Sequence, residues 1–521
     1  MQKENPVIVG LDIGTTKIAA IAGRKNQYGK LEILGFGKAE SSGVNHGMVL
    51  NIEECIRSIN IALEDCMASN PNLNIKEVYV GIAGHHIKSI QTQDDRVINN
   101  AEEEIRKEDI DALIKDQYKT YVPANDQIID IIPQDFTVDK LGGFSMQQVI
   151  GMTGLRVGAN FHIITGDKSA IRNIHRCVKR AELSTKDLVL QPLASAAAVM
   201  CAEDFESGVA IVDIGGGTTD LAIFHDGMLK HTEVIPIAGV NITNDIRIGL
   251  GVLKSQAEQM KVKFGTALAD EAQSNAYITI PGLKGQTQKE ISAKNLASII
   301  QSRMEEILEY VMYHIKQVNL EDKLHGGIIL TGGGSQLKHI LQLTEYKTGM
   351  PARLGLPNEH LSTGYTKELM KPMYATCIGL ILRGYDDFEN NRLRFISNNT
   401  EEAFANNETV EGEFVTMTKT FEPTPQELLS LEFGDTNENI FSENNTENFM
   451  PDITIEPPIE TNEILDLDNT NNNNNNIDNS KDGKEKQNKR EKLINNIFKT
   501  VKTKVIYWFE NIDDNKIDED E

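Results

Sequence analysis

The stretch Ile211-Val-Asp-Ile-Gly-Gly-Gly-Thr-Thr-Asp-Leu-Ala-Ile-Phe224 places three consecutive glycines between two apolar runs. The apolar runs predict two strands, and the glycines predict a hairpin turn that joins them. Because glycine has no Cβ, backbone N–H groups at this turn can approach an anion, and Thr218 and Thr219 add hydroxyl donors. Asp213 and Asp220 would repel a phosphate, so they predict a divalent cation, Mg²⁺ held through water.

A second stretch with the same pattern lies near the start of the chain, at Val7-Ile-Val-Gly-Leu-Asp-Ile-Gly-Thr-Thr-Lys-Ile-Ala-Ala-Ile21. Here Asp12 takes the place of Asp213, and Lys17 adds a positive charge where a β- or γ-phosphate would lie. Either stretch alone also fits an ordinary glycine turn in a hairpin. Two matched copies, 201 residues apart, predict instead a duplicated domain whose halves hold one nucleotide.

A third glycine-rich stretch is Gly327-Ile-Ile-Leu-Thr-Gly-Gly-Gly-Ser-Gln-Leu337, which predicts a buried strand and then a helix that starts near Ser335. Bare backbone at these glycines would let a base and a ribose lie flat against the chain. The stretch is not a P-loop, since no Gly-Lys-Ser/Thr follows. It is not a dinucleotide fingerprint either, since the three glycines are consecutive.

In this order the three stretches resemble the phosphate-1, phosphate-2 and adenosine motifs of the ATPase superfamily that contains actin, heat-shock chaperones and sugar kinases. The resemblance implies that ATP and Mg²⁺ bind between two lobes, with Asp12 and Asp213 holding the ion through water and Gln191 orienting a hydrolytic water. A slow ATPase activity is compatible with this set. The resemblance also implies that Glu258 and Lys261 bind the nucleoside, although alone they would be read as an ordinary i,i+3 surface pair. The other expected nucleotide-binding residues are Gly14, Thr15, Thr16, Lys17, Gly215, Gly216, Gly217, Thr218, Gly333, Gly334 and Ser335.

Residues 84–160 narrow the resemblance to one family. Their motifs are similar in order to those of the bacterial cell division family FtsA, in which a subdomain called 1C is inserted at this point. Within the insertion, Asp94, Asp95 and Arg96 predict a polar loop, and Phe161 to Thr165 is expected to return to the main sheet. The motifs are Val78-Tyr-Val-Gly-Ile-Ala-Gly84, Ile132-Pro-Gln134, Gly151-Met-Thr-Gly-Leu-Arg156 and His162-Ile-Ile-Thr-Gly166.

The predicted fold class is therefore α/β, an actin-like duplicated ATPase fold with two lobes and an FtsA-type 1C insertion. A disordered acidic linker and a C-terminal amphipathic helix are expected to follow it. By resemblance the boundaries are 1–83, 163–205 and 361–385 for subdomain 1A, 84–162 for 1C, 206–240 and 311–360 for 2A, 241–310 for 2B, 386–488 for the linker, 489–512 for the helix and 513–521 for an acidic end.

The charge of the chain is concentrated in the linker. The 521 residues carry a formal net charge of −25, which argues against a nucleic-acid partner. Residues 386–480 hold 22 acidic and 3 basic residues and are rich in Asn, which predicts disorder. Five cysteines without metal-binding spacing predict free thiols in a reducing cytoplasm.

The charge changes sign after the linker. Residues 481–510 carry nine basic and four acidic residues, and apolar side chains recur there at a spacing of three to four. A basic amphipathic helix with Trp on its apolar face predicts a helix that lies in the plane of a membrane surface, although docking on the body or on a partner would also fit. No signal peptide and no run of ~20 apolar residues is present, so the expected contact is peripheral. The residues expected to enter the membrane are Leu493, Ile494, Ile497, Phe498, Val501, Val505, Trp508 and Phe509.

The FtsA resemblance implies a function in cell division. A member of this family would polymerise, would anchor FtsZ filaments of the Z ring to the cytoplasmic side of the inner membrane at the midcell septum, and would recruit later division proteins. Arg303 and Glu306 match charged positions of the surface that docks the C-terminal peptide of FtsZ, although they also fit a solvated helix pair. The alternatives are another actin-like filament, a pilus-assembly adaptor and, with less support, a chaperone or a kinase of the superfamily.

Overall fold

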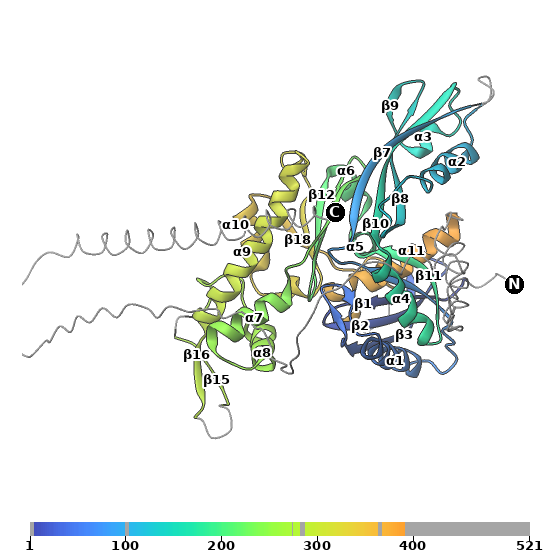
Figure 1. Ribbon diagram of the computed structural model, residues 1–521. Coiled ribbons are helices and arrows are strands. Elements are labelled where there is room, and N and C mark those ends of the chain that lie inside the picture. The colour runs from blue at the N-terminus through green and yellow to red at the C-terminus, as the bar shows by residue number, and fades with distance from the viewer. Residues whose placement is uncertain (1–4, 99–103, 274, 282–286, 363–366, 391–521) are drawn as a thin grey trace, which may run out of the picture. The chain divides into compact units, whose positions relative to one another are not determined.

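The computed structural model describes residues 5–98, 104–273, 275–281, 287–362 and 367–390, all within one structural unit of the chain (Figure 1). The predicted acidic linker, the helix at 489–512 and the acidic end lie outside the described residues. Within the described residues, no helix combines the length and the apolar character that crossing a membrane requires.

The first lobe is built on a five-stranded sheet in the order β11-β6-β1-β2-β3. Strands β1 and β2 form the antiparallel hairpin predicted at the start of the chain, and β6 runs parallel to both β1 and β11. Helices α1 and α4 cover one face with aliphatic side chains. The elements are β1 (Ile8–Ile13), β2 (Lys17–Lys25), β3 (Leu31–Glu40), β4 (Val44–Asn45), β5 (Met48–Val49), α1 (Ile52–Ala68), β6 (Glu77–Ile82), α4 (Lys168–Arg180) and β11 (Ser184–Leu190).

The second lobe repeats this topology with the order β14-β13-β12-β17-β18. Again a central antiparallel hairpin, β12 and β13, has an antiparallel strand on one side and two parallel strands on the other, as a duplicated fold requires. Its elements are α6 (Ala202–Ser207), β12 (Val209–Ile214), β13 (Thr219–His225), β14 (Met228–Ile235), α7 (Gly239–Leu250), α8 (Lys254–Phe264), β15 (Tyr277–Ile280), β16 (Lys289–Ser292), α9 (Ala293–Gln317), β17 (Gly327–Thr331), α10 (Ile340–Thr348) and β18 (Ala352–Leu354).

Two helices pack where the lobes meet. Helix α5 (Gln191–Val199) contacts strands of both sheets, and α11 (Ala375–Asn390) packs along α5 and against the first sheet. The core around them combines Ile21 of the first lobe with Ile211 of the second. Two short 3₁₀ turns, Lys367–Met370 and Pro372–Tyr374, lead into α11.

The insertion has a sheet of its own, in the order β7-β10-β8-β9, so β10 does not return to the main sheet as expected. The expectation of a polar loop at Asp94, Asp95 and Arg96 is also wrong, because these residues belong to β7, where they pair in register with β10. Most residues of β7 are exposed or half-buried, so its charged and polar residues belong to a strand whose side chains contact solvent. The elements are β7 (Lys88–Val97), α2 (Lys107–Gln117), β8 (Asp126–Val138), β9 (Leu141–Phe144), α3 (Met146–Val149) and β10 (Arg156–Asp167).

The close crossing of α5 and α11 depends on Gly379. A Cβ at this position would lie 1.7 Å from the carbonyl oxygen of Ala194. We therefore expect Gly379→Ala to destabilise the protein by about 1–3 kcal/mol, the cost of overpacking a core. Urea unfolding measures this cost.

The matched control is Gly249→Ala in α7, where the nearest atom to an added Cβ is the flexible end of Ile299. Alanine favours a helix over glycine by roughly 0.5–1 kcal/mol, so this control should be neutral or stabilising. Equal stability of the two variants would contradict the described crossing.

Candidate functional site

A cavity of about 490 Å³ lies between the two lobes, where the glycine turns of β1–β2 and β12–β13 meet. Side chains and bare backbone from both turns line it, together with α5, α8 and the turn after β17. Fifteen of the sixteen residues predicted for the nucleotide site are in this lining, and the sixteenth, Ser335, is not. The fifteen are Asp12, Gly14, Thr15, Thr16, Lys17, Gln191, Asp213, Gly215, Gly216, Gly217, Thr218, Glu258, Lys261, Gly333 and Gly334.

The two hairpin turns approach each other too closely for side chains at both. A Cβ on Gly216 would lie 2.4 Å from Cγ2 of Thr16, and one on Gly217 would lie 2.5 Å from Oγ1 of Thr15. His46 of the first lobe adds a contact between the lobes, because its Nδ1 lies 2.8 Å from the carbonyl oxygen of Gly217. The glycines therefore bring the backbone amides of both lobes to one place.

Asp12 is held by two polar contacts inside the cavity. Nζ of Lys17 lies 2.9 Å from Oδ2 of Asp12, and Nε2 of Gln191 donates to Oδ1 over 3.2 Å. Burial alone would lower the pKa of Lys17, but the charge of Asp12 and the hydrogen bond to it outweigh burial and raise this pKa. Lys17 is therefore a stable cation beside Asp12 in the cavity.

Two further carboxylates are buried beside Asp12. Asp213 and Asp220 lie directly opposite each other in the β12–β13 pair. Burial raises the pKa of Asp213, and the neighbouring charge of Asp12 adds to the rise. Burial and then the charge of Asp213 raise the pKa of Asp220 well above its ordinary value. Among the described residues Oδ1 of Asp220 has no hydrogen-bond partner, although it is buried. This anionic group fits a divalent cation.

Residues of the central helices also contact Asp213, and sequence reasoning missed them. Oγ of Ser195 on α5 donates to Oδ2 of Asp213 over 2.6 Å, and Oγ1 of Thr376 on α11 donates to the same oxygen over 3.1 Å. Ser195 lies about one turn after Gln191 on α5. Thr376 is distant in sequence and carries no local signal.

Elsewhere in the cavity lining, Lys261 and Glu258 do more than form a surface pair. Their side chains lie 2.8 Å apart, and Nζ of Lys261 also donates to the carbonyl oxygen of Gly239 and to Oγ1 of Thr243, each over 2.9 Å. These contacts join α8 to α7 at the wall of the cavity. Gly333 also lines the cavity, with open space where a side chain would be.

Two expectations for the third glycine stretch need correction. Ser335 is buried, and its hydroxyl donates to the carbonyl oxygen of Gly332 over 2.8 Å, so it shapes the turn from behind the cavity wall. No α-helix starts at Ser335 either. A 3₁₀ turn, Gly334–Gln336, comes first, and the left-handed conformation of His339 (φ 60°) delays α10 to Ile340.

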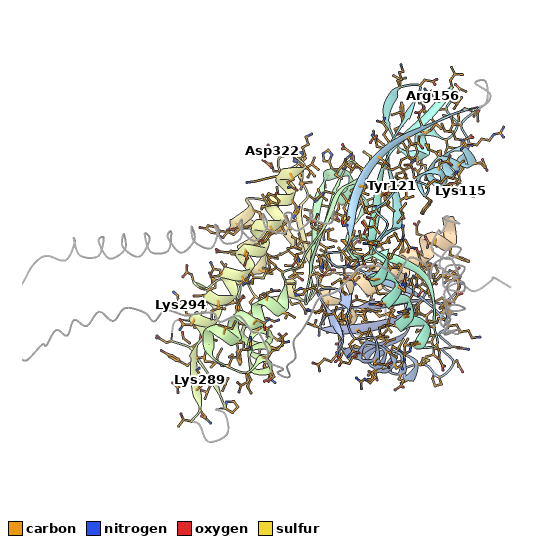
Figure 2. The ribbon with its side chains drawn as sticks, viewed as in Figure 1. Lys115, Tyr121, Arg156, Lys289, Lys294 and Asp322 are labelled. Carbon is orange, nitrogen blue, oxygen red and sulfur yellow. The ribbon has the colours of Figure 1, made fainter. Side chains whose placement is uncertain are left out.

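Arg303 and Glu306 lie outside the cavity, on α9. The guanidinium of Arg303 makes two hydrogen bonds to Asp245 on α7, of 2.6 and 3.1 Å, and a third to Glu306. The charge of Asp245 is thus already paired within the lobe, and Glu306 pairs with Arg303, its neighbour on α9. Figure 2 labels Lys294 in the first turn of α9 and Lys289 at the start of β16, the strand before it.

Two lobes of repeated topology, joined by central helices and separated by a glycine-lined cavity, define an actin-like protein. A solved PilM-PilN type IV pilus biogenesis complex has this fold, with a TM-score of 0.54 at 16% identity over 72% of this chain and 98% of that one. Residues 210–379 match the family model of cell division protein FtsA, and residues 84–165 match the SHS2 domain inserted in FTSA.

Relatives from two bacteria match most of the length of the chain. Cell division protein FtsA of Pseudomonas aeruginosa is 36% identical over 378 residues, which span 73% of this chain and 89% of that protein. The protein of the same name from Escherichia coli (strain K12) is 31% identical over 396 residues, or 74% of this chain and 92% of that protein. The chain belongs to the FtsA family of cell division proteins, so the family expected from the motifs is confirmed.

The buried carboxylates make a prediction about stability without ligand. Asn cannot ionise, so we expect Asp220→Asn to stabilise the ligand-free protein at pH 7 by about 1–3 kcal/mol, the usual cost of an unsatisfied buried polar group. Because the pKa of Asp220 is raised in the folded state, the parent loses stability as the pH rises above the ordinary value of 3.8, and the variant should lose less.

Thermal unfolding from pH 4 to pH 8, with Mg²⁺ removed, measures this difference. The matched control is Asp270→Asn, whose side chain is 98% exposed and should change little. A variant that is less stable than the parent at pH 7 would show that the carboxylate is well satisfied without a cation.

Proposed function

We propose that this chain binds one ATP with Mg²⁺ in the cavity between its lobes and serves as an actin-like adaptor in cell division. The observation that carries the nucleotide site is the meeting of the two glycine turns, which brings donors from both lobes to one place beside three carboxylates. Lys17 would pair with the phosphates, and Glu258 and Lys261 would bind the nucleoside beside Gly333. The family membership carries the role in division.

The chain's own residues would divide the work at the phosphate end. Mg²⁺ would neutralise phosphate charge, and Asp12 and Asp213 would hold its water ligands, as hard carboxylate oxygens do for this ion. Asp12 also accepts a hydrogen bond from Gln191, which keeps this amide at the phosphate end, where it could orient a water. An activity of this kind would be a slow ATPase.

Nucleotide binding would act on the lobes through the central helices. Ser195 and Thr376 bond the same oxygen of Asp213 from α5 and α11. A ligand that contacts both turns binds the closed arrangement of the lobes better than an open one, so it shifts the population towards closure. We propose that closure favours head-to-tail polymers of the chain.

The proposed partner surface lies on the first half of α9, where the C-terminal peptide of FtsZ would dock. Glu306 is half-buried and offers a carboxylate at this surface, while the contacts of Arg303 with Asp245 fix the helix on α7. The proposed membrane segment, at 489–512, lies outside the described residues. Many copies on one polymer would bind a membrane surface multivalently, although one amphipathic helix binds reversibly. The protein would act at the division septum on the cytoplasmic side of the inner membrane, where it would recruit later division proteins.

The nucleotide part of this proposal predicts the effect of Lys17→Ala. Loss of a charge-assisted hydrogen bond costs about 1.5–3 kcal/mol, so ATP affinity should fall roughly ten- to a hundredfold. Calorimetric titration with ATP and Mg²⁺ gives the affinity. The control is Lys25→Ala on the same strand, because Lys25 pairs with Glu389 outside the cavity. Unchanged affinity of Lys17→Ala would overturn the assignment of the site.

The adaptor part predicts what pellets with liposomes that contain anionic lipid. With ATP and Mg²⁺ present, the full chain should pellet together with a labelled FtsZ C-terminal peptide. A chain that ends at Ser480, or one with Ile497→Glu, should stay in solution and still bind the peptide. Asn496→Glu adds the same charge on the opposite side of the predicted helix and should pellet like the parent.

The partner surface is tested in the same assay. Glu306→Gln should reduce the peptide in the pellet and leave the chain itself there, while Glu321→Gln, an exposed carboxylate beyond α9, should change neither. If the full chain binds ATP and ignores both liposomes and peptide, the adaptor role is wrong and the nucleotide site stands.

A further inference from the structure

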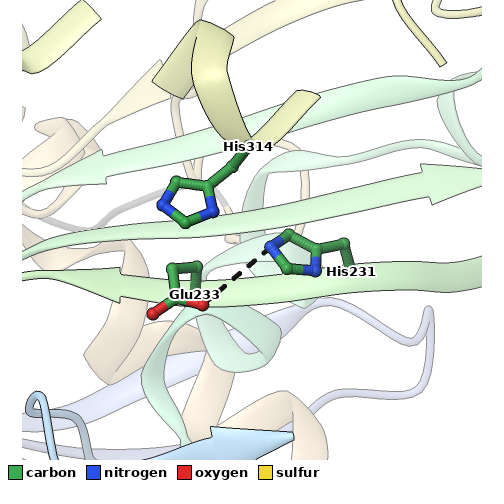
Figure 3. A group of neighbouring side chains, drawn as sticks. All are labelled: His231, Glu233 and His314. Carbon is green, nitrogen blue, oxygen red and sulfur yellow. Dashed lines mark ion pairs between the residues drawn. The ribbon is translucent and has the colours of Figure 1, made fainter. Parts of the chain in front are cut away.

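Outside the cavity, two histidines and a glutamate come together at an edge of the second lobe. His231 and Glu233 are on β14, the edge strand of the sheet, and His314 is in the last turn of α9. One nitrogen from each ring and one carboxylate oxygen all lie within 4.8 Å of one another. Figure 3 shows the three side chains converging, with the ring of His314 reaching from the helix towards the strand.

These side chains occupy positions where the packing of a helix on a sheet ordinarily uses apolar residues. In the β13–β14 pair, His231 lies opposite Ile223, and Glu233 lies opposite Leu221. Residues that lie opposite each other share one face of a sheet, and both partners belong to the apolar core that α9 covers. The polar pair on β14 therefore faces the helix, and His314 meets it there.

The two imidazoles are also short of hydrogen bonds. Among the described residues, Nε2 of His231 and Nδ1 of His314 are buried atoms without a hydrogen-bond partner. Oε2 of Glu233 lies 4.0 Å from Nε2 of His231, beyond hydrogen-bonding distance. The rings are stacked, with centroids 5.4 Å apart and planes 22° from parallel. Buried polar atoms left in this way cost free energy, and an ion bound between them would satisfy both rings.

We propose that His231, Glu233 and His314 form a Zn²⁺ site that ties the end of α9 to the edge strand β14. Two imidazoles and one carboxylate, with water in the fourth position, are a ligand set that Zn²⁺ uses. Imidazole favours this ion over Mg²⁺ and Ca²⁺, which prefer oxygen. Donors bound to a tetrahedral Zn²⁺ at ~2.0–2.1 Å lie ~3.4 Å apart, so the side chains would close by about 1 Å.

The place of the site gives the ion a mechanical role. Strand β14 borders the insertion, since it contacts β7 and β8, and Nε2 of Gln134 on β8 donates to the carbonyl oxygen of Leu229 on β14. Helix α9 carries Arg303, and the ion pair of Arg303 with Asp245 anchors α9 to α7. An ion that joins α9 to β14 would therefore reduce the movement of α9 relative to the insertion. The proposed Zn²⁺ site needs no nucleotide, and its residues are separate from those of the proposed ATP site.

Metal titration of the full chain, free of nucleotide, tests the proposal. Zn²⁺ is added in competition with a chromophoric chelator, and Co²⁺ is used as a spectroscopic probe. The parent should take up one equivalent of Zn²⁺, and its Co²⁺ form should show d–d bands without the charge-transfer band of a thiolate. The second feature separates this site from binding at any of the five cysteines.

Variants then assign the ligands. His231→Gln and His314→Gln should each weaken Zn²⁺ binding by more than the ~10–100-fold that loss of an outer hydrogen-bond partner costs. Both should also lose the rise in unfolding temperature that Zn²⁺ gives the parent, since an ion that binds only the folded state stabilises it. Glu233→Gln is a third variant in case either histidine change impairs folding.

The matched control is His225→Gln on the neighbouring strand. His225 also lies beside a carboxylate, with Nδ1 2.9 Å from Oδ2 of Asp226, but it is not part of the three-residue group. It should bind Zn²⁺ like the parent. The proposal is wrong if the parent takes up no Zn²⁺, if the ligand variants bind it as the parent does, or if the Co²⁺ spectrum is that of a thiolate site.

Discussion

Burial of like charges where the two lobes meet is the constraint on which the rest of the structure depends. Asp12, Asp213 and Asp220 are all at most 6% exposed. Lys17 offsets part of their charge through its contact with Asp12. Burying such a group without a ligand lowers the stability of the fold. Next to it, the fold places two glycine turns whose amides and hydroxyls face the same space. The site therefore combines an excess of negative charge for a cation with a backbone suited to an anion.

The same carboxylates connect the site to the helices between the lobes. Asp213 is bonded by one residue of α5 and one of α11, the helices that pack where the lobes meet. A change of charge at Asp213 would therefore act directly on the hydrogen bonds from these two helices. On the far side of the second sheet, α9 combines the anchoring contact of Arg303 with the polar group at His314, so a single long helix links the proposed partner surface and the proposed Zn²⁺ site.

Much of this arrangement could be predicted from the sequence, because its signals are local. The hairpins depend on glycines flanked by apolar runs, so these elements were found. Other features depend on contacts between distant residues. Thr376 meets Asp213 only in the folded chain, and His314 meets His231 across the helix and sheet. The α-helix expected to start near Ser335 starts only at Ile340, for a different reason. The left-handed backbone of His339 delays it, and no residue pattern in the sequence predicts that conformation. In β7, charged residues on a solvated strand looked like a loop.

The central claim is that both glycine turns hold one nucleotide together, and amide hydrogen exchange measures this most directly. Exchange at peptides that cover 13–18 and 214–219 would be compared with and without ATP and Mg²⁺ in the full chain. The account predicts that both peptides gain protection together, over the same range of ATP concentration, along with the turn at 332–334. Protection of one turn without the other, or of neither while ATP binds, would contradict it.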